Sequence, residues 1–158
     1  MWPYVLIALA FAADRLSKWW VAAFLADNGV TRLNAWLTLR ETYNRGLAFG
    51  LLQGIGPIMG WLSILIVLGL LLYLTQVPRQ EWLLRAGLAL IIGGALGNLI
   101  DRITAGQVLD FIQTPLRSGI FNVADVCINL GLILVLAGLL LHRPTGQPGP
   151  ESEPPPTT

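Results

Sequence analysis

The sequence predicts an all-α membrane protein with four transmembrane helices and a small β-sheet at one membrane surface. Three observations predict this class. Residues of the set AVILMFWYC make up 54% of the 158 residues, and only 12% are charged, against about 25% in soluble domains. Four apolar stretches approach the length that a helix needs to cross a bilayer. Two polar segments between these stretches carry strand-like patterns.

The four stretches predict spans at about residues 2–25, 57–77, 86–102 and 123–141. A secretory signal peptide is the alternative for the first stretch, but residues 1–13 contain no Lys or Arg. We expect residues 1–143 to form a single integral-membrane domain. The proline-rich residues 144–158 offer nothing to pack and are expected to be disordered.

The strand-like segments are residues 27–54 and 103–121. Polar and apolar residues roughly alternate over 31–40, a stretch rich in Thr and aromatics, which favours short strands. In the second segment Gly106 and Gly119 signal turns. Both segments follow an odd-numbered span, so they lie on the same side of the membrane and can share one sheet.

Composition also excludes several functions. The net charge is +1 with no basic run, so a nucleic-acid partner is not expected. One cysteine and one histidine exclude a disulfide scaffold and a pair of zinc fingers. No set of ligands for a metal is recognisable, and we expect no metal and no cofactor.

Polar residues in or beside the spans converge on the side that carries the two strand-like segments. A charge near the centre of a membrane helix costs about 2.5–3.5 kcal/mol, so these side chains should face one another or water. Counting arginines in the loops leaves the orientation in the membrane open. The converging residues are Asp14, Lys18, Asn44, Asn98, Asp101, Arg102, Asp110, Asn122 and Asp125.

Some of these residues also have a structural interpretation as helix-packing groups. Asp14 and Lys18 are four residues apart, on one helix face, and can form an ion pair. Asn98, Asp101 and Arg102 share another face, and the small residues before them permit close helix packing.

The start of the last span has a structural interpretation as well. Asn122 is a good N-cap, and Asp125 three residues later completes a capping box. Asp110 lies between apolar residues on a predicted strand, and a solvated loop position is its alternative. These interpretations stay open beside the functional one.

The chemistry available to the cluster is that of carboxylates. His142 lies on the opposite side, which excludes a Ser-His-Asp triad, and Cys127 has no histidine partner. Two neighbouring Asp side chains share a proton, so that the ionised one can activate water and the protonated one can donate to a carbonyl oxygen. The alternative class is a small membrane transporter or channel subunit with a carboxylate ion path.

Five stretches resemble, in order, the motifs of lipoprotein signal peptidase (signal peptidase II), a family of membrane aspartic peptidases. They are residues 14–18 (DRLSK), 43–50 (YNRGLAFG), 93–102 (GGALGNLIDR), 108–112 (VLDFI) and 121–125 (FNVAD). The resemblance implies an enzyme of the bacterial cytoplasmic (inner) membrane that cleaves lipid-modified prolipoproteins before the diacylglyceryl-cysteine. It also implies an extracytoplasmic β-cradle with the active site, a short surface helix and cytoplasmic termini.

The resemblance places the catalytic dyad at Asp110 and Asp125. It places supporting positions at Asp14, Asn44, Asn98, Arg102 and Asn122, and we add Lys18, Gly46 and Asp101 from the same motifs. Expected partners are the prolipoprotein substrate, membrane lipid and globomycin-type inhibitors, with the enzyme as a monomer. Residues 111–124 are compact for the family, so the loop at the substrate entrance is expected to be trimmed.

The dyad residues differ in their expected surroundings. Asp125 lies at a predicted helix N-terminus, where the helix dipole favours a negative charge. Asp110 lies beside Phe111 near an apolar boundary, where burial favours the protonated form. We therefore expect Asp125 to act as the base that activates water and Asp110 as the acid.

Overall fold

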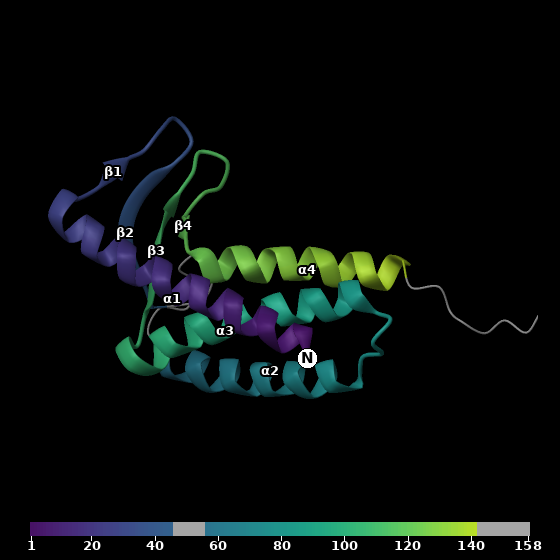
Figure 1. Ribbon diagram of the computed structural model, residues 1–158. Helices are drawn as coiled ribbons and strands as arrows, with labels where there is room; N and C mark the ends of the chain where they lie inside the picture. Colours follow the sequence, from purple (N-terminus) through teal and green to yellow (C-terminus); the bar gives the residue numbers. More distant parts are fainter. Residues whose placement is uncertain (46–55, 142–158) are drawn as a thin grey trace, which may run out of the picture.

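The computed structural model describes residues 1–45 and 56–141, without the side chains of 56–59, as four helices and one sheet (Figure 1). The helices are α1 (Trp2–Asn28), α2 (Gly56–Gln76), α3 (Trp82–Ala105) and α4 (Val123–Leu141). The strands are β1 (Thr31–Arg32), β2 (Thr38–Asn44), β3 (Val108–Gln113) and β4 (Ile120–Phe121). Gly46 and the tail 144–158 lie outside the described residues.

Helix α3 forms the centre of the bundle and packs against each of the other three helices. Its contact with α4 depends on two facing glycines. A Cβ atom on Gly87 would lie 2.6 Å from the carbonyl oxygen of Gly131, and one on Gly131 would lie 2.6 Å from that of Gly87. Small residues of this kind let helix backbones approach closely in a membrane protein.

Helices occupy the positions of the four predicted spans, but α3 begins at Trp82 instead of residue 86, and α1 continues to Asn28. The prediction followed apolar runs and ended them near charges, whereas the helices continue through charged residues. Arg85 lies inside α3, and its guanidinium donates to the carbonyl oxygen of Val77 just after α2 (2.5 Å). At its other end α3 stops at Gly106, whose φ of 69° suits glycine, as the turn signal predicted.

The sheet has the antiparallel order β1-β2-β3-β4. All four strands fall within the predicted segments 27–54 and 103–121, which confirms the sheet. The register of β2 against β3 places Thr42 opposite Asp110. Buried Leu39 and Phe111 pack against Val21 and Leu25 of α1, so the sheet is fixed to the end of the bundle where α1 ends and α4 begins (Figure 1).

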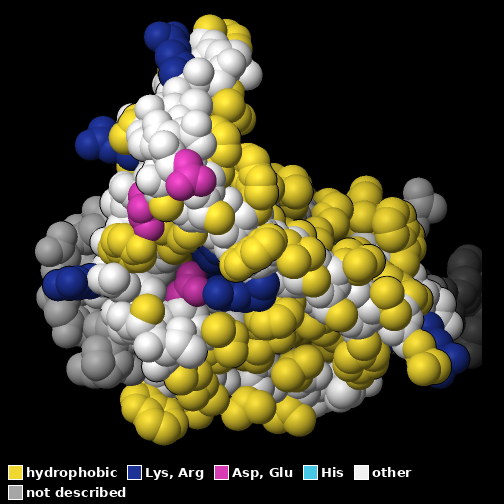
Figure 2. Space-filling view, turned by 60° about the vertical axis from the view of Figure 1, so that its left-hand side comes forward, with side chains coloured by type: hydrophobic (Ala, Val, Ile, Leu, Met, Phe, Trp, Pro, Cys, Tyr) yellow, Lys and Arg dark blue, Asp and Glu magenta, His cyan; other side chains and the backbone are white. Residues whose placement is uncertain are grey.

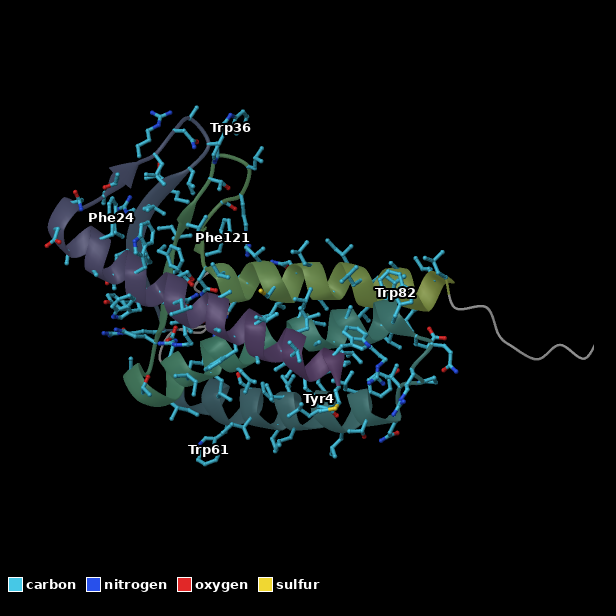
Figure 3. The ribbon with its side chains drawn as sticks, in the orientation of Figure 1. Tyr4, Phe24, Trp36, Trp61, Trp82 and Phe121 are labelled. Atoms are coloured by element: carbon cyan, nitrogen blue, oxygen red, sulfur yellow. The ribbon has the colours of Figure 1, made fainter. Side chains whose placement is uncertain are left out.

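The face of the bundle that Figure 2 shows is largely apolar. By length and composition α3 and α4 are each able to cross a membrane, whereas the apolar stretch Gly60–Gln76 of α2 is shorter. Trp61 and Trp82 lie near opposite ends of the bundle (Figure 3) and are 72% and 62% exposed. Exposed Trp side chains are common in the interface regions of membrane proteins. The described residues contain no additional helix, so the expected surface helix is not among them.

Candidate active site

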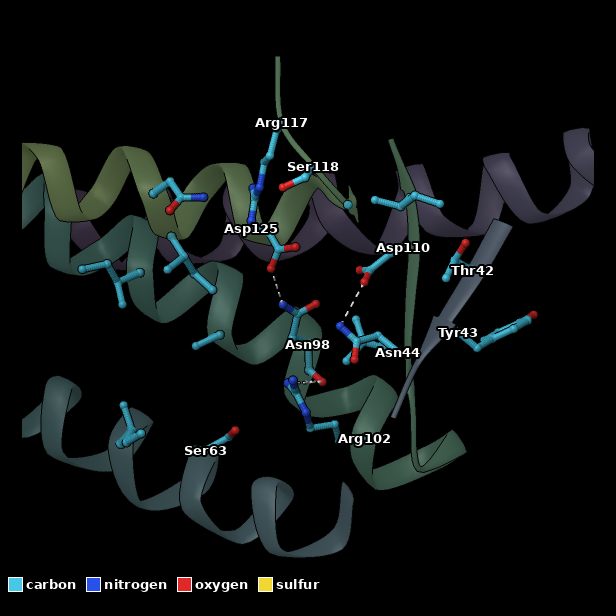
Figure 4. Close-up of a pocket in the computed structure, with 18 residues that line it drawn as sticks. Thr42, Tyr43, Asn44, Ser63, Asn98, Arg102, Asp110, Arg117, Ser118 and Asp125 are labelled. Atoms are coloured by element: carbon cyan, nitrogen blue, oxygen red, sulfur yellow. Dashed lines mark hydrogen bonds between the residues drawn. The ribbon is translucent and has the colours of Figure 1, made fainter. Parts of the chain in front are cut away.

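A pocket of about 830 Å³ opens beside the sheet, between α2, α3 and α4. Figure 2 shows acidic and basic side chains together in a hollow below the sheet, and Figure 4 shows the pocket residues. One part of the lining is polar and the other apolar. The lining residues are Thr42, Tyr43, Asn44, Ser63, Ile66, Ile91, Ala95, Asn98, Arg102, Val108, Asp110, Arg117, Ser118, Gly119, Ile120, Asp125, Ile128 and Asn129.

Asp110 reaches the pocket from β3 and is only 4% exposed, so the interpretation as a solvated loop residue is wrong. Its carboxylate accepts hydrogen bonds from the side-chain amides of Asn122 (2.6 Å) and Asn44 (3.2 Å). The pKa of Asp110 is raised from 3.8 to about 6, mainly by burial and in addition by the negative charge of Asp125. The two amide hydrogen bonds oppose the rise because they stabilise the carboxylate.

Asp125 lies in the first turn of α4 and points toward Asp110 across the pocket (Figure 4). One carboxylate oxygen accepts a hydrogen bond from the Asn98 amide (3.1 Å). The other lies 3.4 Å from the backbone nitrogen of Asn122, and the backbone N–H of Asp125 donates to the Asn122 side-chain oxygen (2.9 Å). The predicted capping box is therefore present, and it orients Asp125 toward the pocket.

Asn122 connects the two carboxylates. It is fully buried; its side-chain oxygen holds the backbone of Asp125, while its nitrogen lies 2.6 Å from Asp110 and 3.1 Å from the Asn98 oxygen. Because a buried amide needs all these partners, its orientation is fixed. One side chain thus sets the position of Asp110 relative to Asp125.

Lys18 lies beneath this pair with only 2% of its surface exposed. Its ammonium nitrogen is 2.8 Å from Asp14, 2.8 Å from Asp101 and 3.0 Å from the side-chain oxygen of Asn98. These three acceptors match the three protons of an ammonium group. The predicted Asp14–Lys18 ion pair is therefore confirmed, and it extends to α3.

Asp14 and Asp101 attach this ion pair to other elements. The second oxygen of Asp14 accepts the backbone N–H of Ala124 (3.0 Å), so α1 caps the N-terminus of α4. Asp101 pairs also with Arg15, and one of its oxygens lies 3.4 Å from the backbone nitrogen of Leu109, next to Asp110. The network thereby links α1, α3, α4 and β3.

Arg102 lines the pocket from α3, and its guanidinium lies 3.5 Å from the backbone oxygen of Asn98. Its negative neighbours are Asp125, Asp110 and Asp101. The position suits a cation that faces both the carboxylates and a peptide carbonyl in the pocket. Gly46, the remaining predicted site residue, is outside the described residues.

The sequence analysis missed several pocket residues. Arg117 and Ser118 lie above Asp125 on the turn between β3 and β4 (Figure 4), and the Arg117 guanidinium lies 4.9 Å from the centre of the Phe121 ring. The turn signal at Gly119 located this loop but not its contact with the pocket. Asn129 follows Asp125 by four residues on α4, and this spacing was the available signal for a shared face.

The arrangement supports acid–base chemistry. Within residues 1–45 and 56–141, no three His, Cys, Asp or Glu side chains are grouped so that they could hold a metal ion. Two carboxylates face one pocket, and the one with the raised pKa is suited to carry a proton. Such a pair can bind water at the ionised group and donate a proton from the other.

Comparison with known proteins gives consistent similarities. The family model described as signal peptidase (SPase) II matches residues 6–141. Relatives named lipoprotein signal peptidase include one from Symbiobacterium thermophilum, 37% identical over 92% of this chain and 99% of the relative. Another, from Gloeobacter violaceus, is 39% identical over 88% of this chain and 82% of the relative.

Solved structures agree with this result. Two structures described as bacterial membrane enzymes, determined by the in meso method at 2.3 and 1.9 Å resolution, match with TM-scores of 0.78 and 0.79. Both are 26% identical in sequence to this chain. They cover 87% and 89% of this chain, which in turn covers 87% and 94% of theirs. The similarity therefore includes nearly the whole fold.

Proposed function

The chain belongs to the signal peptidase II family, and from this premise we propose that it cleaves lipid-modified prolipoproteins with Asp110 and Asp125 as its catalytic dyad. Membership makes the chain an aspartic-type signal peptidase and a membrane enzyme. The cleaved bond is the one before the diacylglyceryl-cysteine, in the bacterial inner membrane. The remaining pocket residues bind or orient the substrate.

One observation carries this proposal: Asn122 holds both carboxylates at one pocket. It donates to Asp110 (2.6 Å) and accepts from the backbone of Asp125 (2.9 Å). The helix dipole of α4 favours a negative charge at Asp125. Burial favours the protonated form of Asp110, whose pKa is about 6. The two residues are thus suited to opposite roles, base and acid.

Attack by water is the first chemical step. Asp125 takes a proton from a bound water as the water oxygen forms a bond to the carbonyl carbon. Asp110 gives its proton to the carbonyl oxygen, so the tetrahedral intermediate is neutral and carries two hydroxyl groups. General acid and base steps of this kind contribute roughly 10²–10⁴-fold each.

Breakage of the carbon–nitrogen bond is the second step. Asp125 passes its proton to the leaving nitrogen, which becomes the free amine of the lipid-modified cysteine. One hydroxyl of the intermediate returns its proton to Asp110, and the new carboxyl group remains on the signal peptide. Both Asp residues are then back in their starting protonation states.

The proposed topology has all four helices crossing the membrane, the sheet outside the cytoplasm and both termini inside it. The apolar surface of the bundle and the exposed Trp61 and Trp82 near its two ends support this placement. The pocket between α2 and α4 has an apolar part for lipid chains and for globomycin-type inhibitors. We propose that the enzyme works as a monomer.

The ion-path alternative has little support from the charge distribution. A path for protons or cations places charges at several depths across the bilayer. The α2 segment contains no charged residue, and Asp125 is the single charged residue in α4, at the end next to the sheet. In α2 and α4 the one charge therefore lies at the end next to the sheet, which favours a surface site over a path across the bilayer.

Cleavage of a synthetic diacylglyceryl-cysteine peptide in detergent micelles tests the dyad. Asp110→Asn and Asp125→Asn should each reduce kcat by about 10²–10⁴-fold, because each removes one acid–base group. The double variant should be little worse than either single one, since the two groups act as a unit. Substrate binding should persist, because the lipid group binds away from the dyad.

Asp27→Asn is the matched control, because Asp27 is exposed at the end of α1. It should cleave at the wild-type rate. Substantial cleavage by either dyad variant, with folding verified, would show that another group performs the chemistry.

A further inference from the structure

Asn129 is a pocket residue that the proposed chemistry does not use. It lies four residues after Asp125 on α4, so both side chains project from the same helix face into the pocket. Its side chain is exposed there, and no described residue forms a hydrogen bond with it. An amide that only joined helices would have a partner on a neighbouring helix.

The pocket that Asn129 lines is partly apolar. Ile66 of α2, Ile91 and Ala95 of α3 and Ile128 of α4 are among its lining residues. Water can reach this exposed amide. A ligand that fills the pocket displaces this water and must supply hydrogen bonds to Asn129 in its place.

A peptide substrate brings such a group. The chain around a bond that is being hydrolysed is extended, so its N–H and C=O groups have no partners within a helix. In the membrane these unpaired groups are costly, and an Asn side chain can pair with both because it has a donor and an acceptor.

The distance along α4 indicates which peptide unit is involved. Four helical residues rise about 6 Å, and an extended chain advances about 3.3 Å per residue. Asn129 thus lies about two substrate residues away from the scissile bond, which is placed next to Asp125. It is displaced from the sheet toward the middle of α4, the direction in which an apolar signal peptide continues into the bilayer.

We propose that Asn129 binds the substrate backbone about two residues before the scissile bond, on the signal-peptide side. This inference rests on the proposed function. Its hydrogen bonds form with the bound substrate and persist in the transition state. Loss of such uniform binding raises KM and leaves kcat nearly unchanged, whereas loss of a dyad residue lowers kcat.

The experiment measures KM and kcat for diacylglyceryl-cysteine peptides in micelles. Asn129→Leu should raise KM roughly 3- to 10-fold, the value of one or two neutral hydrogen bonds, and Asn129→Gln should restore part of the loss. The matched control is Asn28→Leu, the same change at an exposed position at the end of α1. It should leave both constants unchanged.

A second set of peptides replaces one amide at a time by an ester, which removes the N–H donor. The ester about two residues before the scissile bond should raise KM for the wild type and have no further effect in Asn129→Leu. A wild-type KM for Asn129→Leu, or equal ester effects in both proteins, would overturn the role of Asn129. Absence of cleavage by the wild type would instead refute the proposed function.

Discussion

At the scale of single residues, Lys18 holds the polar network together. Its ammonium group contacts Asp14, Asp101 and Asn98 in a buried position. Removing one member of a buried ion pair leaves an uncompensated charge, which is more harmful than losing the attraction alone. The stability of the fold therefore depends on Lys18 even though it does not line the pocket.

Lys18→Met should lower the free energy of unfolding by about 3–5 kcal/mol, because two carboxylates lose their common partner. Unfolding in mixed micelles measures this change. Arg15→Gln is the comparison, since Arg15 pairs with Asp101 alone and its side chain is 35% exposed. That variant should lose about 0–1 kcal/mol. Equal losses in the two variants would contradict the special position of Lys18.

Asn44 tunes the acidity of Asp110. Its amide donates to Asp110 and so limits the rise in the pKa of that carboxyl, which is about 6 with this hydrogen bond in place. Without Asn44 the pKa of Asp110 rises, and the carboxyl keeps its proton to higher pH. If Asp110 is the acid, activity is lost as pH rises through this pKa, and the alkaline side of the pH profile moves upward.

In the wild type, kcat/KM should fall as the pH rises through about 6, because kcat/KM reports the pKa of Asp110 in the free enzyme. Asn44→Ala should shift this alkaline limb to higher pH. Gln107→Ala is the control, because Gln107 binds Arg45 on the surface. If the alkaline limb of Asn44→Ala stayed in place or moved to lower pH, Asp110 would have a different role.

At the scale of elements, the contact of α1 with α3 positions the start of α4. Gly97 of α3 lies against Asp14 of α1, and a Cβ atom there would be 2.3 Å from the Asp14 oxygen that binds Lys18. Asp14 in turn binds the N-terminus of α4 at Ala124. A change at this glycine is therefore transmitted to a third helix.

Gly97→Ala should lower both the thermal stability of the protein and kcat. The added methyl group displaces the Asp14 carboxylate from the backbone N–H of Ala124 at the start of α4. Gly69→Ala is the matched control on α2, where an added Cβ meets no atom within 4 Å. Alanine favours a helix over glycine by about 1 kcal/mol, so this control should be neutral or slightly stabilising. Thermal unfolding and cleavage rates of the two variants provide the comparison. A fully active Gly97→Ala would show that the Asp14 cap is dispensable.

At the scale of the whole molecule, the proposed mechanism uses only groups supplied by the protein chain. Cleavage should therefore continue after treatment with EDTA, and Cys127→Ala should retain wild-type activity. Cleavage assays with and without chelator test the first statement. Loss of activity on chelation that a divalent ion restores would remove the carboxylate mechanism in favour of a metal site.

Local patterns predicted much of this molecule. Apolar runs located the helices, alternation located the sheet, and spacing predicted the Asp14–Lys18 pair and the capping box at Asn122. The contact of Asp14 with Ala124 joins residues 110 positions apart, and no local pattern encodes such a pair. The burial of Asp110 likewise depends on how β3 packs at the end of the bundle.

The contact between Asp14 and Ala124 also has a consequence for biosynthesis. Ribosomes make α1 first and α4 last among the described helices, so the cap on α4 joins the earliest helix to the latest. A nascent chain that has not yet delivered α4 lacks Asp125, Asn122 and this cap together. Under the proposed mechanism, cleavage therefore becomes possible only after α4 has joined the bundle, late in the synthesis of the described helices.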